Sequence, residues 1–205
     1  MDISGIADAL ADRGYLIVPQ FISQQKALDF YHYARSLDNS DWQLAAVGRR
    51  EQQTINTNVR GDRIHWLDSE RSEEQEYLGY MSTLREGLNR ELFMGLFDYE
   101  AHLANYQPGA YYKKHLDAFK GRSNRILTTV LYLNPEWHKA DGGELVIYDE
   151  RGRVLEEVLP TLGTMVIFLS DRFVHEVKVG MRDRYSITGW FRLNGSISGI
   201  IDPPR

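Results

Sequence analysis

Four residues in the second half of the chain have types and a spacing that could hold a metal ion and an organic anion. His115 and Asp117 are separated by one residue, and His175 and Arg184 follow later. Two neutral imidazoles and one carboxylate form the ligand set that holds non-haem Fe(II) and leaves coordination positions open. The planar guanidinium of Arg184 can bind a second, remote carboxylate. This set predicts an iron oxygenase that uses a dicarboxylic co-substrate.

The two ligand segments both lie in strand-like sequence. Residues i and i+2 of a strand point to the same side, so His115 and Asp117 can reach one ion together. His175 lies in the alternating segment 173–177. A histidine close to an aspartate is usually a surface pair or a satisfied core residue. The β-rich context and Arg184, nine residues after His175, favour the metal site instead.

Fe(II) suits these ligands better than other common ions. A zinc enzyme can use a similar trio, but it would not need Arg184. Magnesium and calcium prefer oxygen ligands, so two histidines count against them. The remaining histidines are predicted to be surface or packing residues: His32, His65, His102 and His138.

The segment 184–191 alternates cleanly between two faces. One face carries Arg184, Ser186, Thr188 and Trp190. A buried arginine needs an anion, which is either a bound carboxylate or an internal Asp or Glu; the segment leaves both open. Tyr132, in the strand-like run 130–133, could donate its hydroxyl to the same bound carboxylate.

The elements that must position these residues change character along the chain. Before about residue 97 the pattern is mainly helical, with a helix from Ile3 that ends at Gly14, one capped by Ser23, and one that begins at Ser72. A short strand is predicted at 15–18, and residues 38 to about 66 are predicted to be polar and irregular. Eight short β-rich runs then follow, bounded by turn signals: 100–107, 111–115, 125–133, 144–149, 153–158, 164–169, 173–179 and 184–193.

Helices followed by short strands predict an α+β fold. Strands at this spacing fit a sandwich or jelly roll, with the early helices against one sheet face. The length of 205 residues favours a single domain over 1–205, with helical support at about 1–97 and a β core at about 98–193.

Composition excludes several other classes of protein. Zero cysteines rule out disulfides and thiolate chemistry, which fits a cytoplasmic location. A net charge of -5 argues against a nucleic-acid partner. No stretch reaches the roughly 18 to 20 apolar residues of a membrane span, and the first residues lack a secretory pattern.

Several motifs together resemble one family of enzymes. Besides the HxD…H…R set, the chain contains Arg60-Gly61-Asp62-Arg63-Ile64-His65-Trp66, Tyr106-Gln107-Pro108-Gly109, Gly142-Gly143-Glu144-Leu145 and Arg184-Tyr185-Ser186-Ile187-Thr188. From about Thr57 to Phe191 the sequence resembles the 2-oxoglutarate- and Fe(II)-dependent prolyl 4-hydroxylases, most closely the hypoxia-factor-type enzymes and their bacterial relatives.

The resemblance implies a double-stranded β-helix with Fe(II) on His115, Asp117 and His175. The distal carboxylate of 2-oxoglutarate would meet Arg184 and Tyr132. The same pocket would be lined by Tyr106, Tyr112, Leu145, Thr188 and Trp190. Residues from about Val47 to Gly61 would form a loop that closes over a peptide, while Arg60 and Asp62 would have a structural or anchoring role.

The implied reaction uses O2 and 2-oxoglutarate to hydroxylate a prolyl 4-position, with release of succinate and CO2 and with ascorbate as a further cofactor. The expected partner is a cytosolic protein with a target proline, and related bacterial enzymes point to a translation factor. Three alternatives stay open: a hydroxylase of a free amino acid or other small molecule, a non-catalytic sensor of oxygen and 2-oxoglutarate, and a nucleic-acid demethylase.

Overall fold

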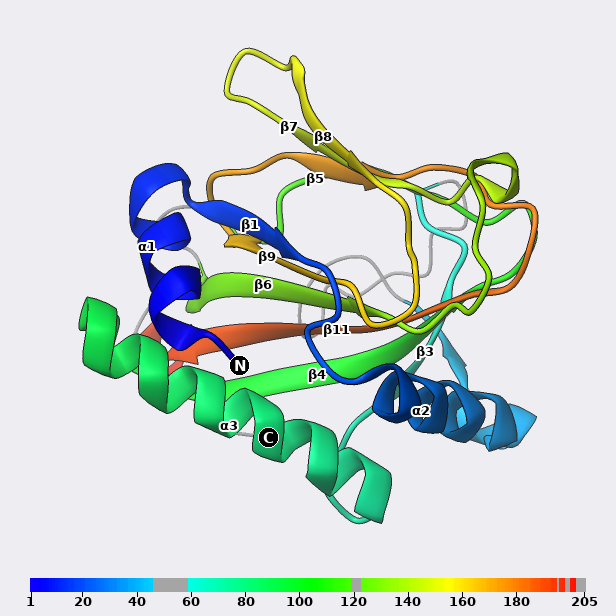
Figure 1. Ribbon diagram of the computed structural model, residues 1–205, viewed down its shortest axis with the longest axis horizontal. Coiled ribbons are helices and arrows are strands. Elements are labelled where there is room, and N and C mark those ends of the chain that lie inside the picture. Colours follow the sequence, from blue (N-terminus) through cyan, green and yellow to red (C-terminus); the bar gives the residue numbers. More distant parts are fainter. Residues whose placement is uncertain (46–58, 119–122, 195, 198–199, 202–205) are drawn as a thin grey trace.

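Two facing β-sheets and a layer of helices make up this computed structural model, which describes residues 1–45, 59–118, 123–194, 196–197 and 200–201 (Figure 1). The α-helices of this part of the chain are α1 (Ile3–Arg13), α2 (Gln24–Ser36) and α3 (Ser72–Leu92). They cover the outer face of the larger sheet, while the smaller sheet lies across its inner face (Figure 1).

The larger sheet contains seven antiparallel strands. In spatial order these are β1 (Tyr15–Val18), β9 (Met165–Leu169), β6 (Arg125–Tyr132), β11 (Arg184–Leu193), β4 (Leu96–Tyr106), β3 (Arg63–Trp66) and β2 (Gln43–Leu44). The four-stranded sheet is β5 (Tyr112–His115), β10 (His175–Val177), β7 (Leu145–Tyr148) and β8 (Val154–Val158). Short pieces complete the description: η1 (Asn39–Asp41), η3 (Lys139–Asp141), β12 (Ser196–Ile197) and β13 (Ile200–Ile201).

The predicted α+β fold with a double-stranded β-helix core is confirmed. Each of the eight β-rich runs contains a strand, and the helix ends also agree with the prediction. Gly14 ends α1 at φ 81°, in the left-handed region that glycine adopts without a steric cost. The Ser23 hydroxyl accepts a hydrogen bond from the backbone N–H of Lys26 at the start of α2.

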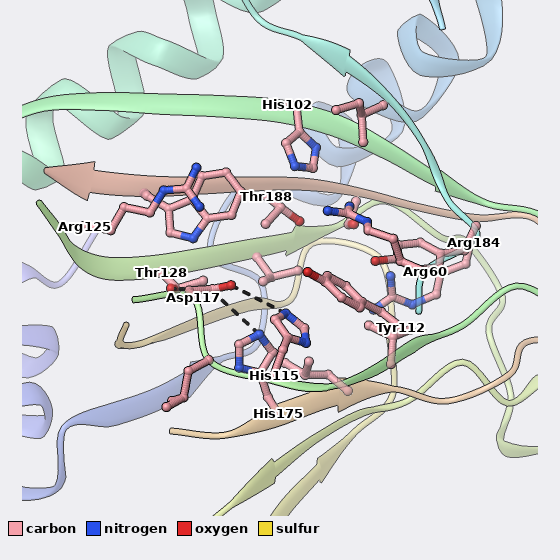
Figure 2. A pocket seen from close by; sticks show the side chains of 18 of the residues that line it. Arg60, His102, Tyr112, His115, Asp117, Arg125, Thr128, His175, Arg184 and Thr188 are labelled. Carbon is pink, nitrogen blue, oxygen red and sulfur yellow. Dashed lines mark hydrogen bonds and ion pairs between the residues drawn. The ribbon is translucent and has the colours of Figure 1, made fainter. Parts of the chain in front are cut away.

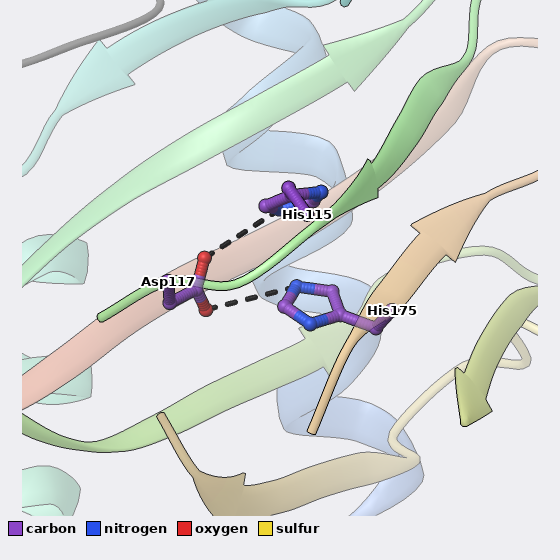
Figure 3. A group of neighbouring side chains, drawn as sticks. All are labelled: His115, Asp117 and His175. Atoms are coloured by element: carbon purple, nitrogen blue, oxygen red, sulfur yellow. Dashed lines mark ion pairs between the residues drawn. The ribbon is translucent and has the colours of Figure 1, made fainter. Parts of the chain in front are cut away.

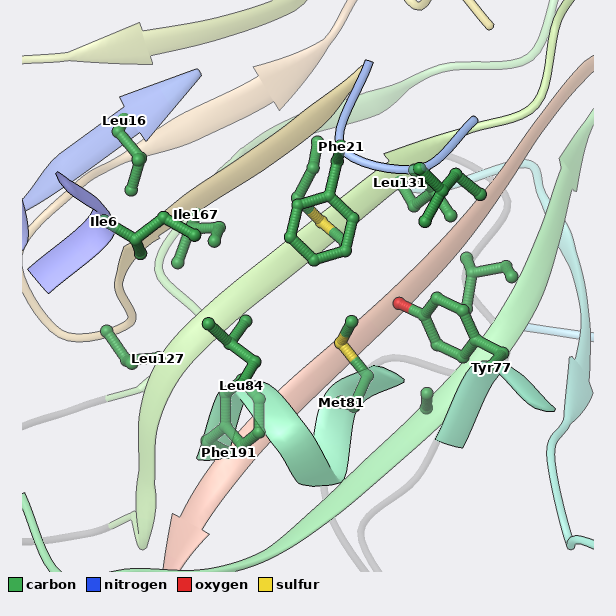
Figure 4. Packing of buried hydrophobic residues seen from close by; sticks show 14 of the residues in the cluster. Ile6, Leu16, Phe21, Tyr77, Met81, Leu84, Leu127, Leu131, Ile167 and Phe191 are labelled. Carbon is green, nitrogen blue, oxygen red and sulfur yellow. The ribbon is translucent and has the colours of Figure 1, made fainter. Parts of the chain in front are cut away.

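Strand alternation divides the interior into two layers. One layer lies between the helices and the larger sheet, where Ile187 and Phe191 of β11 share a cluster with Leu84 of α3 (Figure 4). The other lies between the two sheets and includes Phe168 of β9 and Ile147 of β7. The period of two therefore sends one face of β11 into the core and leaves its other face for the space between the sheets.

The prediction of irregular structure from 38 to about 66 is wrong at its two ends. Residues 63–66 form β3, which pairs with β4, and 43–44 form β2 at the sheet edge. The local sequence conceals this strand because only Ile64 has an aliphatic side chain, while His65 bonds to Glu74 of α3 at 2.8 Å. The backbone pairing offered by β4 decides the conformation. Most of the predicted closing loop, residues 47–58, lies outside the described residues.

No described helix is both long enough and apolar enough to cross a membrane.

Gly189 on β11 lies where no side chain fits. A Cβ there would lie 2.2 Å from Oη of Tyr99 and 2.8 Å from the backbone oxygen of Glu100. A Gly189→Ala variant should therefore lose about 2 kcal/mol or more of unfolding free energy through overpacking. Gly79, on the exposed side of α3, has no heavy atom within 4 Å of such a Cβ, so Gly79→Ala should gain about 0.5–1 kcal/mol. Urea unfolding measures both, and equal midpoints would contradict the packing argument.

Candidate active site

Three predicted ligand side chains converge between the two sheets (Figure 3). His115 and His175 are opposite one another in the β5–β10 pair, and Asp117 follows two residues after His115. Asp117 Oδ1 lies 3.5 Å from Nε2 of His115, and its Oδ2 lies 3.7 Å from Nε2 of His175. All three ligand atoms lie within 4.8 Å of one another, so a single cation can contact all of them.

Backbone carbonyls orient both imidazoles toward this point. Nδ1 of His115 donates to the carbonyl oxygen of Lys113 at 2.7 Å, and Nδ1 of His175 donates to that of Phe173 at 3.0 Å. A carbonyl only accepts, so Nδ1 carries the hydrogen and Nε2 keeps its lone pair. Burial, followed by the neighbouring His115 ring, lowers the pKa of His175 to about 4. The His175 ring is therefore neutral near pH 7, as a metal ligand must be.

The Asp117 carboxylate is held in its ionised form. Burial would raise the pKa of Asp117, but His175, His115 and the Thr128 hydroxyl outweigh it and hold this pKa well below its usual value. Thr128 of β6 donates to Asp117 Oδ2 at 2.7 Å, and the Ser170 hydroxyl lies 2.9 Å from Thr128 Oγ1. Thr128 and Ser170 were not predicted, because strand pairing alone brings them near Asp117.

A Thr128→Val variant tests this support. Valine has nearly the same shape but cannot donate to Asp117, so the carboxylate loses one of its orienting contacts. Loss of such a support costs about 10- to 100-fold in metal affinity. We expect that loss in a Mn(II) titration of the purified protein. Thr83→Val is the matched control, since this exposed hydroxyl donates to the Gly79 carbonyl within α3, away from the cavity. An unchanged affinity in Thr128→Val would contradict the role.

A cavity of about 600 Å³ opens beside the triad (Figure 2). Its wall contains all but one of the predicted site residues: Tyr106, Tyr112, His115, Asp117, Leu145, His175, Arg184, Thr188 and Trp190. Tyr132 is the exception. It is fully buried and not part of the described wall, but its ring centre lies 5.0 Å from Cζ of Arg184.

Arg184 is a buried cation without an acidic partner among the described residues. It is 2% exposed, and its Nε donates to the Gly143 carbonyl at 2.8 Å. Within the described part of the chain, its buried Nη2 has no hydrogen-bond partner, and neither do the hydroxyls of Tyr132 and Ser186. Burial raises the pKa of Tyr132 to about 12, against the opposing effect of Arg184, so its hydroxyl keeps its proton. These unpaired groups fit a carboxylate that enters the cavity.

Other charged and aromatic residues shape the cavity without having been predicted to do so. Arg125 of β6 lies over the Trp190 ring at 3.6 Å and pairs with Glu100 at 2.8 Å. The described part of β3 contributes Ile64 and Trp66 to the wall. Strand register brings these residues to the same cavity wall, and no local sequence pattern predicts that register.

The Arg60–Gly61–Asp62 segment has the anchoring geometry that was expected of it. The Arg60 guanidinium pairs with the buried Asp62 carboxylate and lies 4.4 Å from the Tyr112 ring centre. Tyr112 stacks in turn on His115, with ring centres 3.6 Å apart and planes at 15°. The segment thus supports the predicted metal ligand His115 through Tyr112.

Comparisons with known proteins agree with this geometry. The sequence model of the 2OG-Fe(II) oxygenase superfamily matches residues 101–192, which contain the triad and Arg184. A prolyl 3-hydroxylase, OGFOD1 of Xenopus laevis, is 33% identical over 102 residues, which is 44% of this chain and 19% of that protein. The chain therefore spans about a fifth of the length of this curated relative.

Solved structures match over nearly the whole chain. A prolyl-4-hydroxylase of Pseudomonas putida is 36% identical with a TM-score of 0.85, covering 94% of this chain and 100% of that one. A prolyl hydroxylase of Trichoplax adhaerens, in complex with a peptide of the hypoxia inducible factor oxygen degradation domain, is 25% identical with a TM-score of 0.75, covering 93% and 88%. The chain therefore belongs to the 2-oxoglutarate- and Fe(II)-dependent dioxygenases, within the family of the prolyl hydroxylases.

Proposed function

We propose that this protein hydroxylates a prolyl residue of another protein at the 4-position, using Fe(II), 2-oxoglutarate and O2. The observation that carries the proposal is the joint presence, in one cavity, of the converged triad and of Arg184, which has no acidic partner among the described residues. Peptide hydroxylation is supported by the similarity to the Pseudomonas putida and Trichoplax adhaerens enzymes.

The residues of this chain have separate tasks in that reaction. His115, Asp117 and His175 would hold Fe(II), while Arg184 and Tyr132 would bind the distal carboxylate of 2-oxoglutarate. When bound, iron and 2-oxoglutarate supply the oxidising chemistry, in which O2 gives one oxygen atom to the substrate and one to succinate, with loss of CO2. Tyr106, Tyr112, Leu145, Thr188 and Trp190 would enclose the co-substrate and exclude bulk water. Ascorbate would keep the iron reduced.

The position of the new hydroxyl and the partner go beyond the family assignment. The 4-position is favoured by the higher identity and coverage of the Pseudomonas putida prolyl-4-hydroxylase relative to the partial match with a prolyl 3-hydroxylase. We further propose a cytoplasmic partner, since cysteine is absent from the sequence, and a translation factor as its class.

Mass spectrometry of a treated host lysate tests the proposal. The purified enzyme is incubated with Fe(II), 2-oxoglutarate and ascorbate, and proline-containing peptides are examined for one added oxygen atom. Acid hydrolysis and chromatography then distinguish 4-hydroxyproline from 3-hydroxyproline. We expect 4-hydroxyproline together with stoichiometric succinate. 3-Hydroxyproline would overturn the assigned position. Succinate formation stimulated by small molecules and by no proline-containing protein would overturn the proposed substrate class.

A further inference from the structure

His102 lies in the cavity wall (Figure 2), and its ring contacts two tryptophans. It lies on β4 and is 3% exposed. Its ring centre is 5.1 Å from that of Trp66, at an interplanar angle of 83°, and 5.5 Å from that of Trp190. The imidazole is therefore flanked by two aromatic rings in the cavity wall.

Strand register places His102 away from Arg184, the residue assigned to the distal carboxylate of 2-oxoglutarate. It pairs with Thr188 of β11 on one side and with Trp66 of β3 on the other. Arg184 pairs with Tyr106, four residues further along β4, which corresponds to about 13 Å of strand. His102 belongs to the larger sheet, whereas His115 and His175 lie on the smaller one. It thus faces the triad across the cavity, on the side toward the β3–β2 edge.

One nitrogen of this imidazole donates a hydrogen bond within the protein, and the other can accept one from a ligand. Nδ1 lies 3.2 Å from the backbone oxygen of Leu103, which can only accept, so Nδ1 carries the hydrogen. Burial, followed by the positive charge of Arg60, lowers the pKa of His102 to about 4, so the ring is neutral near pH 7. Nε2 then keeps its lone pair, and the hydrogen bond that His102 makes with the described residues uses Nδ1 alone.

We propose that Nε2 of His102 accepts a hydrogen bond from a backbone N–H of the peptide substrate next to the target proline. The proposal rests on the proposed prolyl hydroxylation. Proline has no N–H, so the donor belongs to a neighbouring residue. A peptide that enters the cavity loses water from that N–H, and a buried donor without an acceptor is costly. His102 is thereby a specificity-determining residue: through this hydrogen bond it determines which prolyl residue of the bound peptide lies next to the triad.

A packing role alone would not need an imidazole at this place. A leucine or phenylalanine would fill the space beside Trp66 and Trp190 without the cost of removing a polar ring from water. Glutamine can present a carbonyl oxygen near the position of Nε2, whereas leucine has a similar size and no acceptor. Comparing His102→Gln with His102→Leu therefore distinguishes the effect of losing the hydrogen-bond acceptor from the effect of changing the side-chain volume.

The test measures kcat/KM for a proline-containing peptide that the wild-type enzyme hydroxylates, and for copies with a single backbone N-methyl group at positions flanking the proline. His102→Leu should lose about three- to tenfold, mainly through KM, as expected for one hydrogen bond, and His102→Gln should retain most of the activity. N-methylation at one position should cost the wild type a similar factor. The same methyl group should cost His102→Leu nothing further, because the acceptor is already gone.

Three results would overturn the proposal. The first is a wild-type kcat/KM in His102→Leu. The second is an N-methyl group that, at every position tested, lowers the kcat/KM of His102→Leu by the same factor as that of the wild type. The third is a wild-type scan in which no N-methyl position lowers kcat/KM, which decides the question even if His102→Leu does not fold. A wild-type enzyme that hydroxylates no proline would overturn the proposed function itself, and it would be recognised before any variant is compared.

Discussion

An Asp117→Ala variant is expected to lose turnover and most of its metal affinity. Asp117 supplies the negative charge of the triad, and its carboxylate lies within 4 Å of Nε2 of both His115 and His175. Loss of an outer support already costs about 10- to 100-fold, so loss of the ligand itself should weaken Mn(II) binding by more than about 100-fold. Titration with Mn(II) and succinate formation with Fe(II) are the two measurements.

Two variants make the Asp117→Ala result specific. Asp8→Ala removes an exposed carboxylate on α1 and should leave metal affinity at the wild-type value. The Mn(II) affinity of Thr128→Val should lie between those of Asp8→Ala and Asp117→Ala, because the substitution weakens the orientation of Asp117 without removing a ligand. If Asp117→Ala bound Mn(II) within about tenfold of the wild type, the assignment of the triad as the metal site would be wrong.

An Arg184→Met variant should raise the KM for 2-oxoglutarate by on the order of 100-fold, because hydrogen bonds from a guanidinium to a carboxylate are charge-assisted and would be buried at this site. The methionine keeps an extended side chain in the same space. The wild-type protein, loaded with Mn(II), should also be stabilised against heat by saturating 2-oxoglutarate. At about 100 times the dissociation constant this stabilisation amounts to about 2.7 kcal/mol, and Arg184→Met should lose most of it.

Stability of the ligand-free protein should respond differently to Arg184→Met. The variant loses the hydrogen bond to the Gly143 carbonyl but also removes a buried guanidinium with an unpaired nitrogen. These effects oppose one another, so the unfolding free energy should change by less than about 1 kcal/mol. A large destabilisation would indicate a structural arginine rather than a binding one.

Matched variants set the scale for Arg184. Tyr132→Phe removes one hydroxyl donor and should raise the KM for 2-oxoglutarate by about tenfold. Arg182→Met removes a neighbouring arginine that pairs with Asp141 at 3.1 Å and is 44% exposed, so this KM should stay at the wild-type value. Equal effects of the two arginine substitutions would contradict the assigned pocket.

Much of the fold could be predicted because its signals are local. Alternation along 184–191 follows from the period of two of an extended backbone, and it correctly separated the cavity face from the core face of β11. Gly14 and Ser23 marked helix ends because each satisfies a backbone requirement at its own position. The ligand types at 115, 117 and 175 restricted the chemistry because few metals prefer two imidazoles and one carboxylate.

Contacts that depend on strand register could not be predicted. The segment 63–66 is a strand because β4 offers it a partner, and its own polar sequence gives no such indication. His102 was predicted to be a surface or packing residue, although it alternates with Ala104 and Tyr106 on one face of β4. That relation to Tyr106 was the available signal for its place in the wall.

By itself, the sequence determined the strand faces and the helix ends, and it supplied the candidate metal ligands and Arg184, because these follow from residue type and backbone period. Only the tertiary structure decided which distant side chains meet: Thr128 on Asp117, Tyr112 stacked on His115, and His102 opposite the triad. The physical reason is that strand order and register bring together residues far apart in the chain, and both are set by the packing of the two sheets as a whole.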